Sequence, residues 1–282
     1  MESAIVAQPA GSDAQWFASW FDSVHYHKLY AHRDAAEAAR FVEALVARLK
    51  PAAGSSMLDL GCGGGRHARH LAAGGFDVTG LDLAARSIEA ARRFEGRSLR
   101  FRQHDMRVPF GRRAFDYVFS FFTSFGYFDD PAEQLTVVQN MARALKPGGR
   151  LVLDYLNTRY ADEHLTPHEV KEVDGVAYRI RRWTDGRRFF KRIVVDEAGA
   201  VAPIEYREQV ARFSLADFEG MFAAHGLDIV ELYGDYQLSA YDPRTSPRLI
   251  LVARKRGMSG EEGYLRERFL RTRLIVSGET PR

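Results

Sequence analysis

Residues 57–65 have the sequence Met-Leu-Asp-Leu-Gly-Cys-Gly-Gly-Gly, an apolar run that leads directly into a glycine-rich turn. Glycines at 61, 63 and 65 let the backbone turn sharply and approach a ligand with no Cβ atom in between. Residues 66–73 then have a helical pattern. A helix that starts there presents free N–H groups and its positive dipole end to a bound molecule. The stretch therefore predicts a strand, a loop and a helix that hold a nucleotide-like cofactor.

A second short strand ends in an acid at the spacing that such a site requires. Residues 76–82, Phe-Asp-Val-Thr-Gly-Leu-Asp, end at Asp82, roughly 20 residues downstream, where an acid accepts ribose hydroxyls in dinucleotide-binding folds. The NAD fingerprint G-x-G-x-x-G needs a glycine where Arg66 stands, and the P-loop needs a lysine after its glycines that is absent here. The pattern that remains is D-x-G-x-G-x-G, from Asp59 to Gly65.

This pattern resembles motif I of the class I S-adenosylmethionine-dependent methyltransferases. Residues 76–82 resemble the next motif of that family, and three later segments resemble its third, fourth and fifth strands with their loops: residues 99–106, 115–122 and 145–154. The resemblance implies a doubly wound, Rossmann-like α/β sheet, closed by an antiparallel edge strand. It also implies S-adenosyl-L-methionine as methyl donor, S-adenosyl-L-homocysteine as product, and in-line transfer to a nitrogen or oxygen of a small-molecule acceptor, with no metal.

The resemblance assigns the glycine-rich loop to the amino-acid part of the cofactor. Gly61 and Gly63 are expected to line it by backbone contact, and Cys62 lies between them in the same loop. Asp59 is expected to lie beneath, directly or through water. The alternative is that Asp59 only caps the turn that follows it.

The ends of the later strands are assigned to the rest of the cofactor. Asp82 is expected to accept both ribose hydroxyls, and Leu83 to pack on the adenine. Asp105 is expected to accept from the adenine amino group, unless it is only a turn residue, and Met106 to place its backbone N–H on the ring. Phe121 is expected near the methionine portion.

The N-terminal segment, residues 1–34, is expected to form a helical lid, because aromatic residues recur at helical spacing and polar ones follow. Tyr26, His27, Tyr30 and Arg33 are the candidates to contact cofactor or substrate. The alternative is the end of an ordinary surface helix.

Methyl transfer needs a general base only if the acceptor arrives protonated. His27 is the first candidate, because an unperturbed histidine titrates near pH 6.5 and this one stands on the expected lid. Tyr127, in the aromatic loop after the fourth strand, is the second. Both residues could instead only shape the site, since positioning alone can carry much of the reaction.

The chain divides into four expected parts. Residues 35–159 and 214–255 form the methyltransferase domain, and residues 256–282 form a mobile tail. Residues 160–213 alternate in polarity around Asp185-Gly186, a hairpin signal. This predicts an inserted antiparallel cap over the substrate side, or a flap that only stabilises the fold.

Composition fits a cytoplasmic enzyme that acts as a monomer or homodimer. The chain has 282 residues and 46% hydrophobic content, enough for one large domain with an elaboration. No apolar run approaches the roughly 20 residues of a membrane span, and residues 1–10 lack the pattern of a signal peptide. Cys62 is the single cysteine, which excludes an internal disulfide. The nine histidines show no metal-ligand spacing.

Two other functions remain open at this point. The basic hairpin 179–192 could dock an RNA or protein substrate, although a net charge of +3 is small for a dedicated phosphate binder. The motifs of nucleobase methyltransferases are absent, so nucleic acid is a disfavoured partner. The chain could also be a non-catalytic subunit or sensor that binds S-adenosylmethionine.

Overall fold

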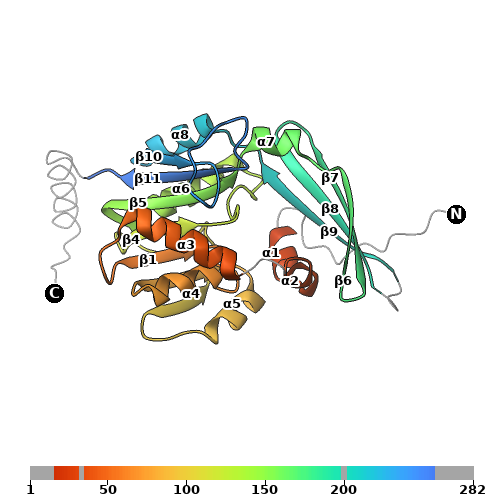
Figure 1. Ribbon diagram of the computed structural model, residues 1–282, viewed down its shortest axis with the longest axis horizontal. Helices are drawn as coiled ribbons and strands as arrows, with labels where there is room; N and C mark the ends of the chain where they lie inside the picture. Colours follow the sequence, from red (N-terminus) through yellow and green to blue (C-terminus); the bar gives the residue numbers. More distant parts are fainter. Residues whose placement is uncertain (1–15, 32–34, 198–201, 258–282) are drawn as a thin grey trace, which may run out of the picture.

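Two β-sheets carry the fold in the computed structural model, which describes residues 16–31, 35–197 and 202–257 (Figure 1). Seven strands form the larger sheet in the order β10-β11-β5-β4-β1-β2-β3. Their bounds are Ser56–Leu60 (β1), Asp77–Asp82 (β2), Leu99–Gln103 (β3), Phe115–Ser120 (β4), Leu145–Leu156 (β5), Leu227–Tyr233 (β10) and Arg248–Lys255 (β11). The predicted α/β sheet is therefore present.

One feature of this sheet was predicted wrongly. The antiparallel strand, β11, does not lie at the edge: it pairs with β5 on one side and with β10 on the other. The edge strand is β10. Its Val230 is 49% exposed, so this strand is partly open to water. Strand β11 is instead apolar on both faces from Leu249 to Ala253, as an interior strand must be.

Helices cover both faces of the larger sheet, which makes it doubly wound. They are α3 (Ala35–Leu49), α4 (Arg66–Ala73), α5 (Ala85–Arg92), α6 (Pro131–Ala144) and α8 (Leu215–Ala224). Strand residues alternate between the two faces. In β11, Leu249 and Leu251 share one apolar core with α6 and α8, and Ile250 and Val252 share the other with α3, α4 and α5.

The smaller sheet is antiparallel and lies between β5 and α8 in the sequence. Its strands are β6 (His168–Val173), β7 (Val176–Thr184), β8 (Arg188–Asp196) and β9 (Ile204–Ala211), and α7 (Thr158–Glu163) leads into it. The predicted turn joins β7 to β8: Gly186 has φ +87°, and the Asp185 carboxylate accepts two backbone N–H groups. The antiparallel insertion was predicted, whereas β6 and α7 were not.

The N-terminal helices α1 (Trp16–Phe21) and α2 (Val24–Leu29) lie between the two sheets (Figure 1). They share an apolar core with the insertion rather than with the larger sheet alone. Its buried members are Trp20, Leu29, Val176, Tyr178, Ile180, Ile193 and Val195. Helices and insertion thus pack as one apolar unit. Arg33 lies outside the described residues, as do most of the predicted tail and residues 1–15.

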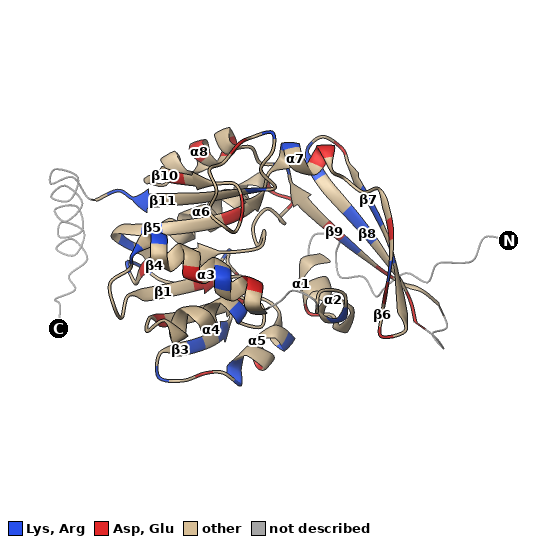
Figure 2. Cartoon of the chain, in the orientation of Figure 1, with Lys and Arg blue, Asp and Glu red and all other residues tan. Residues whose placement is uncertain are grey.

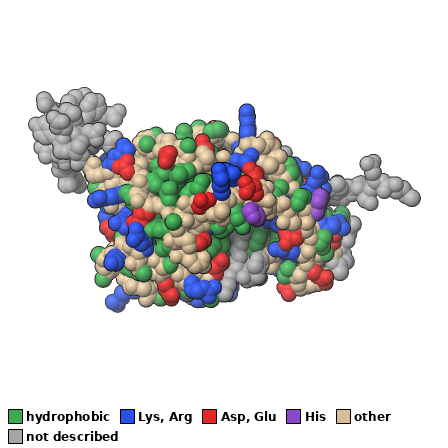
Figure 3. Space-filling view, turned by 45° about the horizontal axis from the view of Figure 1, so that its top comes forward, with side chains coloured by type: hydrophobic (Ala, Val, Ile, Leu, Met, Phe, Trp, Pro, Cys, Tyr) green, Lys and Arg blue, Asp and Glu red, His purple; other side chains and the backbone are tan. Residues whose placement is uncertain are grey.

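Most cations of the hairpin 179–192 are paired with acids. The ion pairs are Arg179–Asp196, Arg182–Glu169, Arg188–Asp129, Lys191–Glu208 and Arg192–Glu205. Figure 2 shows both signs of charge along the four-stranded sheet, and Figure 3 shows them interspersed over the visible face. Paired cations leave little unbalanced charge for a phosphate backbone. None of the helices in the described ranges has the length and apolar character needed to cross a membrane.

Leu29 provides a test of the packing between α2 and the insertion. Leu29→Ala should lower the free energy of unfolding by about 2–4 kcal/mol, because it removes a side chain that is 1% exposed from a closed core. Val24→Ala, on the same helix but 47% exposed, should change it by less than about 0.5 kcal/mol. Urea unfolding measures both. Equal effects would mean that α2 does not pack as described.

Candidate functional site

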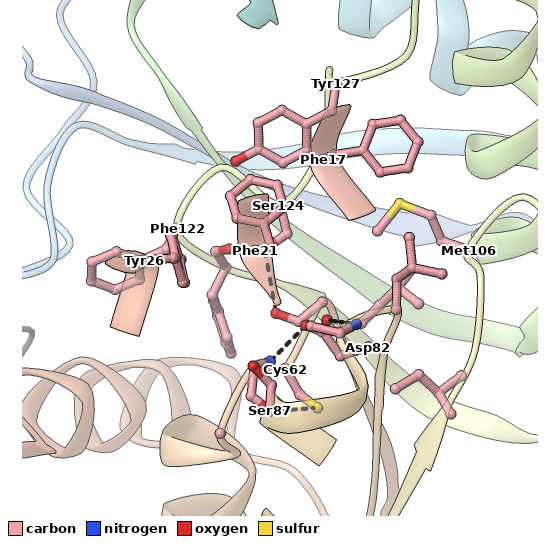
Figure 4. Close-up of a pocket in the computed structure, with 18 of the residues that line it drawn as sticks. Phe17, Phe21, Tyr26, Cys62, Asp82, Ser87, Met106, Phe122, Ser124 and Tyr127 are labelled. Carbon is pink, nitrogen blue, oxygen red and sulfur yellow. Dashed lines mark hydrogen bonds between the residues drawn. The ribbon is translucent and has the colours of Figure 1, made fainter. Parts of the chain in front are cut away.

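A cavity of about 420 Å³ opens at the carboxyl ends of β1, β2, β3 and β4. The strand order reverses between β1 and β4, and such a switch point is where α/β sheets bind ligands. Twelve of the predicted site residues line the cavity: Tyr26, His27, Tyr30, Gly61, Cys62, Gly63, Asp82, Leu83, Asp105, Met106, Phe121 and Tyr127. Asp59 lies behind its wall. Figure 4 shows the aromatic residues on one side and Asp82 with Cys62 on the other.

The glycine-rich loop between β1 and α4 contains glycine for two different physical reasons. Gly61 has φ +77°, and a Cβ atom there would lie 2.5 Å from the Cβ of Ser124, so the packing leaves no room for a side chain at this position. Gly63 has φ +53°, yet no described atom lies within 4 Å of where its Cβ would be. The backbone at Gly63 therefore faces the open cavity. Cys62 is buried under the loop, and burial raises the pKa of its thiol.

Asp82 fixes the loop from the end of β2. One carboxylate oxygen accepts the N–H of Gly63 at 2.7 Å and the other accepts the N–H of Ala84 at 2.8 Å. Burial raises the pKa of Asp82, and these hydrogen bonds limit the rise. Because each carboxylate oxygen can accept two hydrogen bonds, Asp82 keeps acceptor capacity toward the cavity.

Asp59 lies beneath the loop, 1% exposed. Neither of its carboxylate oxygens has a hydrogen-bond partner among the described residues. Burial and the nearby charge of Asp82 raise the pKa of Asp59 to about 7. A buried acid without a donor is costly unless a ligand or water supplies one.

His67 is a second buried polar group at this end of the cavity, and the sequence did not single it out. Its ring lies 4.7 Å from that of Phe121 and 5.4 Å from that of Phe122, and the Nε2 atom has no partner within the described ranges. Burial lowers the pKa of His67, so the imidazole is neutral at pH 7.

The loop after β3 contributes Asp105 and Met106. Arg107 binds the Asp105 carboxylate through its backbone N–H, its Nε and its Nη2. Burial opposes ionisation of Asp105, but these hydrogen bonds outweigh it and lower the pKa. Asn140 of α6 donates to the carbonyl oxygens of Met106 and Arg107, at 3.1 and 3.0 Å. The carboxylate is therefore ionised and fixed, and its assignment to adenine stays a prediction.

A buried ion pair holds the loop after β4. Asp154 of β5 accepts from Arg248 Nε at 2.8 Å and from the backbone N–H of Phe122 at 2.8 Å, and Arg248 Nη2 donates to Thr123 Oγ1 at 2.9 Å. Phe122 and Thr123 have φ +53° and +57°, which is unfavourable for residues with a Cβ. The ion pair stabilises this turn, and Tyr236 donates to Asp154 as well.

Three of the predicted residues, His27, Tyr30 and Tyr127, have different surroundings in the structure. His27 is exposed at the cavity mouth, and its partial burial lowers the pKa, so the ring is neutral at pH 7. The Tyr30 hydroxyl donates to Glu208 at 3.0 Å, which ties α2 to the insertion. The Tyr127 hydroxyl donates to the carbonyl oxygen of Thr123. Its ring packs 5.0 Å from that of Phe21.

Glu208 of β9 also lines the cavity, although no sequence pattern predicted it there. It accepts from Trp20 Nε1 at 2.6 Å and from Tyr30, and it pairs with Lys191 at 3.3 Å. Burial opposes its charge, but Lys191 and these donors outweigh it and lower the pKa of Glu208. Only the pairing with Lys191, directly opposite in register, follows from the strand pattern.

These features fit a nucleoside cofactor with polar and positively charged groups. The cavity offers an open glycine backbone, acceptor oxygens on Asp82 and the His67 ring, whose Nε2 atom has no partner among the described residues; Asp59, equally without a partner there, lies buried behind the wall. A cationic ligand part near Asp59 would offset the cost of ionising that acid. Among the described residues, no three His, Cys, Asp or Glu side chains come together as a metal site would require.

Comparison with known proteins agrees with this geometry. Residues 57–149 match the family model described as a methyltransferase domain. The dTDP-3-amino-3,4,6-trideoxy-alpha-D-glucopyranose N,N-dimethyltransferase of Streptomyces venezuelae is 30% identical over 207 residues, 71% of this chain and 86% of that protein. The dTDP-3-amino-3,6-dideoxy-alpha-D-glucopyranose N,N-dimethyltransferase of Streptomyces fradiae is 30% identical over 238 residues, 80% and 89%.

A solved structure has the same architecture. It is an amino pentose methyltransferase of Micromonospora echinaspora with S-adenosylmethionine bound. It aligns with a TM-score of 0.61 and 26% identity, over 83% of this chain and 97% of that one. With the predicted fold and the glycine loop in place, this chain belongs to the class I S-adenosylmethionine-dependent methyltransferases.

Proposed function

We propose that this enzyme methylates a nitrogen or oxygen atom of a small-molecule acceptor. The observation that carries the proposal is one cavity shared by the glycine loop and by aromatic residues of α1 and α2. A cavity that combines aromatic rings with several polar groups suits a small molecule. The relatives named above act on amino sugars, which is consistent with this class of acceptor.

When bound, S-adenosyl-L-methionine supplies an activated methyl group on a sulfonium. We propose that Gly61, Cys62 and Gly63 hold its amino-acid part, with Asp59 and His67 beneath. Its ribose would lie at Asp82. Leu83, Asp105 and Met106 would then surround the adenine, and Phe121 the methionine chain. These residues position the donor and exclude water, and such positioning can carry much of the rate enhancement.

His27 is the proposed base for an acceptor that arrives protonated. This residue lines the cavity from α2 and its ring is neutral at pH 7, so it can take a proton. Tyr127 is the weaker candidate, because its hydroxyl already donates to Thr123. We assign Tyr127, with Tyr26 and Tyr30, to shaping the acceptor end.

The parts of the chain have corresponding proposed roles. Residues 16–31, the described part of the predicted lid 1–34, would cover the cavity, and the insertion 160–213 would cap the acceptor; Arg33 lies outside the described residues. Residues 35–159 and 214–255 form the catalytic domain, placed in the cytoplasm. Docking of RNA or protein through residues 179–192 is not favoured, because its cations are largely paired. A role without catalysis is not favoured either, because every predicted cofactor residue within the described ranges lines or underlies the cavity.

Asp82 tests the cofactor site. Asp82→Ala should weaken S-adenosyl-L-homocysteine binding by about 1.5–3 kcal/mol, roughly 10- to 150-fold, through lost charge-assisted hydrogen bonds and a looser loop. Asp77→Ala, at the exposed start of the same strand, should leave affinity unchanged. Gly63→Val should abolish binding, because the side chain enters the cavity. Calorimetry measures all three. Wild-type affinity in folded Asp82→Ala would refute the ribose assignment.

Asp59 should make cofactor binding depend on pH. Its pKa of about 7 is raised in the free protein, and the positive charges of S-adenosyl-L-methionine favour the ionised form. Binding must then release a proton below pH 7, so affinity should rise by up to about tenfold from pH 6 to pH 8. Asp59→Asn should flatten this dependence. An unchanged pH dependence in Asp59→Asn, measured by calorimetry, would contradict the assignment.

His27→Gln tests the base. A neutral His27 is required, and burial lowers its pKa, so the wild-type kcat/KM should have an acidic limb below the ordinary titration range of histidine, and the variant should lose this limb. Its rate at pH 8 should be about 10²- to 10⁴-fold lower. The acceptor is found first by a metabolite screen with labelled donor. An unchanged rate and profile, with donor affinity intact, would remove His27 from the mechanism.

A further inference from the structure

The cavity has a second end, away from the glycine loop, where α1 and α2 meet the insertion. Rings surround this end: Phe17, Phe21, Tyr26, Tyr30, Tyr127 and Phe128. Among the described residues of the insertion, Glu208 alone lines the cavity. The four-stranded sheet therefore reaches the site through one carboxylate set among aromatic residues.

Glu208 is held in place by three side chains. Its Oε1 atom accepts from the indole of Trp20 at 2.6 Å and from the hydroxyl of Tyr30 at 3.0 Å, whereas its Oε2 atom has Lys191 Nζ at 3.3 Å. Lys191 is not among the residues that line the cavity. Of this ion pair, only Glu208 lines the cavity, and Lys191 Nζ contacts the Tyr30 hydroxyl as well as the carboxylate.

The carboxylate retains capacity for a ligand. An ionised carboxylate has about four acceptor positions, and most of the donors here converge on one oxygen. The side chain of Glu208 is 22% exposed, and the residue lines the cavity. A cationic donor from a ligand would find an ionised, preoriented partner at Oε2.

We propose that Glu208 recognises the acceptor as an ammonium ion, which makes the enzyme selective for amines over hydroxyl compounds. This inference deepens the proposed methyl transfer and rests on it. Ring faces attract a cation, and a charge-assisted hydrogen bond is roughly twice as strong as a neutral one. A hydroxyl acceptor of the same shape gains neither. The bound nitrogen still has to lose a proton to a base before it can accept a methyl group.

The test compares benzylamine, cationic at pH 7.5, with benzyl alcohol, its nearly isosteric neutral counterpart. Each is titrated by calorimetry into the full chain saturated with S-adenosyl-L-homocysteine. Wild type should bind the cation at least about tenfold more tightly, and Glu208→Gln should reduce this preference to less than about threefold. Glu208→Gln should retain wild-type affinity for S-adenosyl-L-homocysteine, because Glu208 lies away from the glycine loop.

Glu205→Gln is the matched control. Glu205 lies three residues earlier on β9, on its opposite face, and pairs with Arg192 at 2.5 Å. This variant should keep the full preference for the cation. If Glu208→Gln does not fold, the wild type alone can still refute the proposal, because equal binding of benzylamine and benzyl alcohol would exclude recognition of a cation.

Three results would overturn the proposal: no preference for the cation in wild type, a preference that survives Glu208→Gln in folded protein, or no detectable binding of either probe. Failure to bind S-adenosyl-L-homocysteine in the same experiment would instead refute the proposed function. The two failures are therefore distinguishable.

Discussion

The buried ion pair between Asp154 and Arg248 is the interaction on which the site depends. It joins β5 to β11 and clamps Phe122 and Thr123 in a backbone conformation that neither residue favours by itself. Ion pairs of this kind contribute little net stability, because desolvation offsets their attraction. What the ion pair provides is a fixed position for the turn at Phe122 and Thr123. The clamped turn sets the wall against which the ring of His67 packs.

The two ends of the cavity treat their acids in opposite ways. At the glycine-loop end, Asp59 is buried with no hydrogen-bond partner for its carboxylate oxygens among the described residues, and burial raises its pKa to about 7. A ligand that carries positive charge would stabilise its ionised form. At the other end, Glu208 receives donors from α1, the end of α2 and β8 and is ionised before any ligand arrives. The first arrangement favours a cofactor that brings positive charge, and the second favours an acceptor recognised without rearrangement of the protein.

Local sequence patterns predicted the segment from β1 to β2 almost residue by residue, because glycine geometry and strand alternation act within a few residues. The pattern of β6, with its partly buried residues on one face and short length, is too polar to separate from a loop, and α7 has no buried residue to mark it. The edge assignment failed because sheet order depends on pairing between distant strands. Glu208 was missed for the same reason: on β9 it is one acid in an alternating strand, and only the packing of α1 and α2 turns it toward the cavity.

The shared core of α1, α2 and the insertion has a consequence for how acceptor specificity can be transplanted. Trp20 and Leu29 are buried against Tyr178 and Ile193, although the two groups stand far apart in the sequence. A chimera that exchanges only the insertion between two related enzymes would leave those side chains against a foreign surface and Glu208 without its indole partner. A chimera would therefore have to exchange two separate segments, the N-terminal helices and the insertion, and take both from the same parent enzyme.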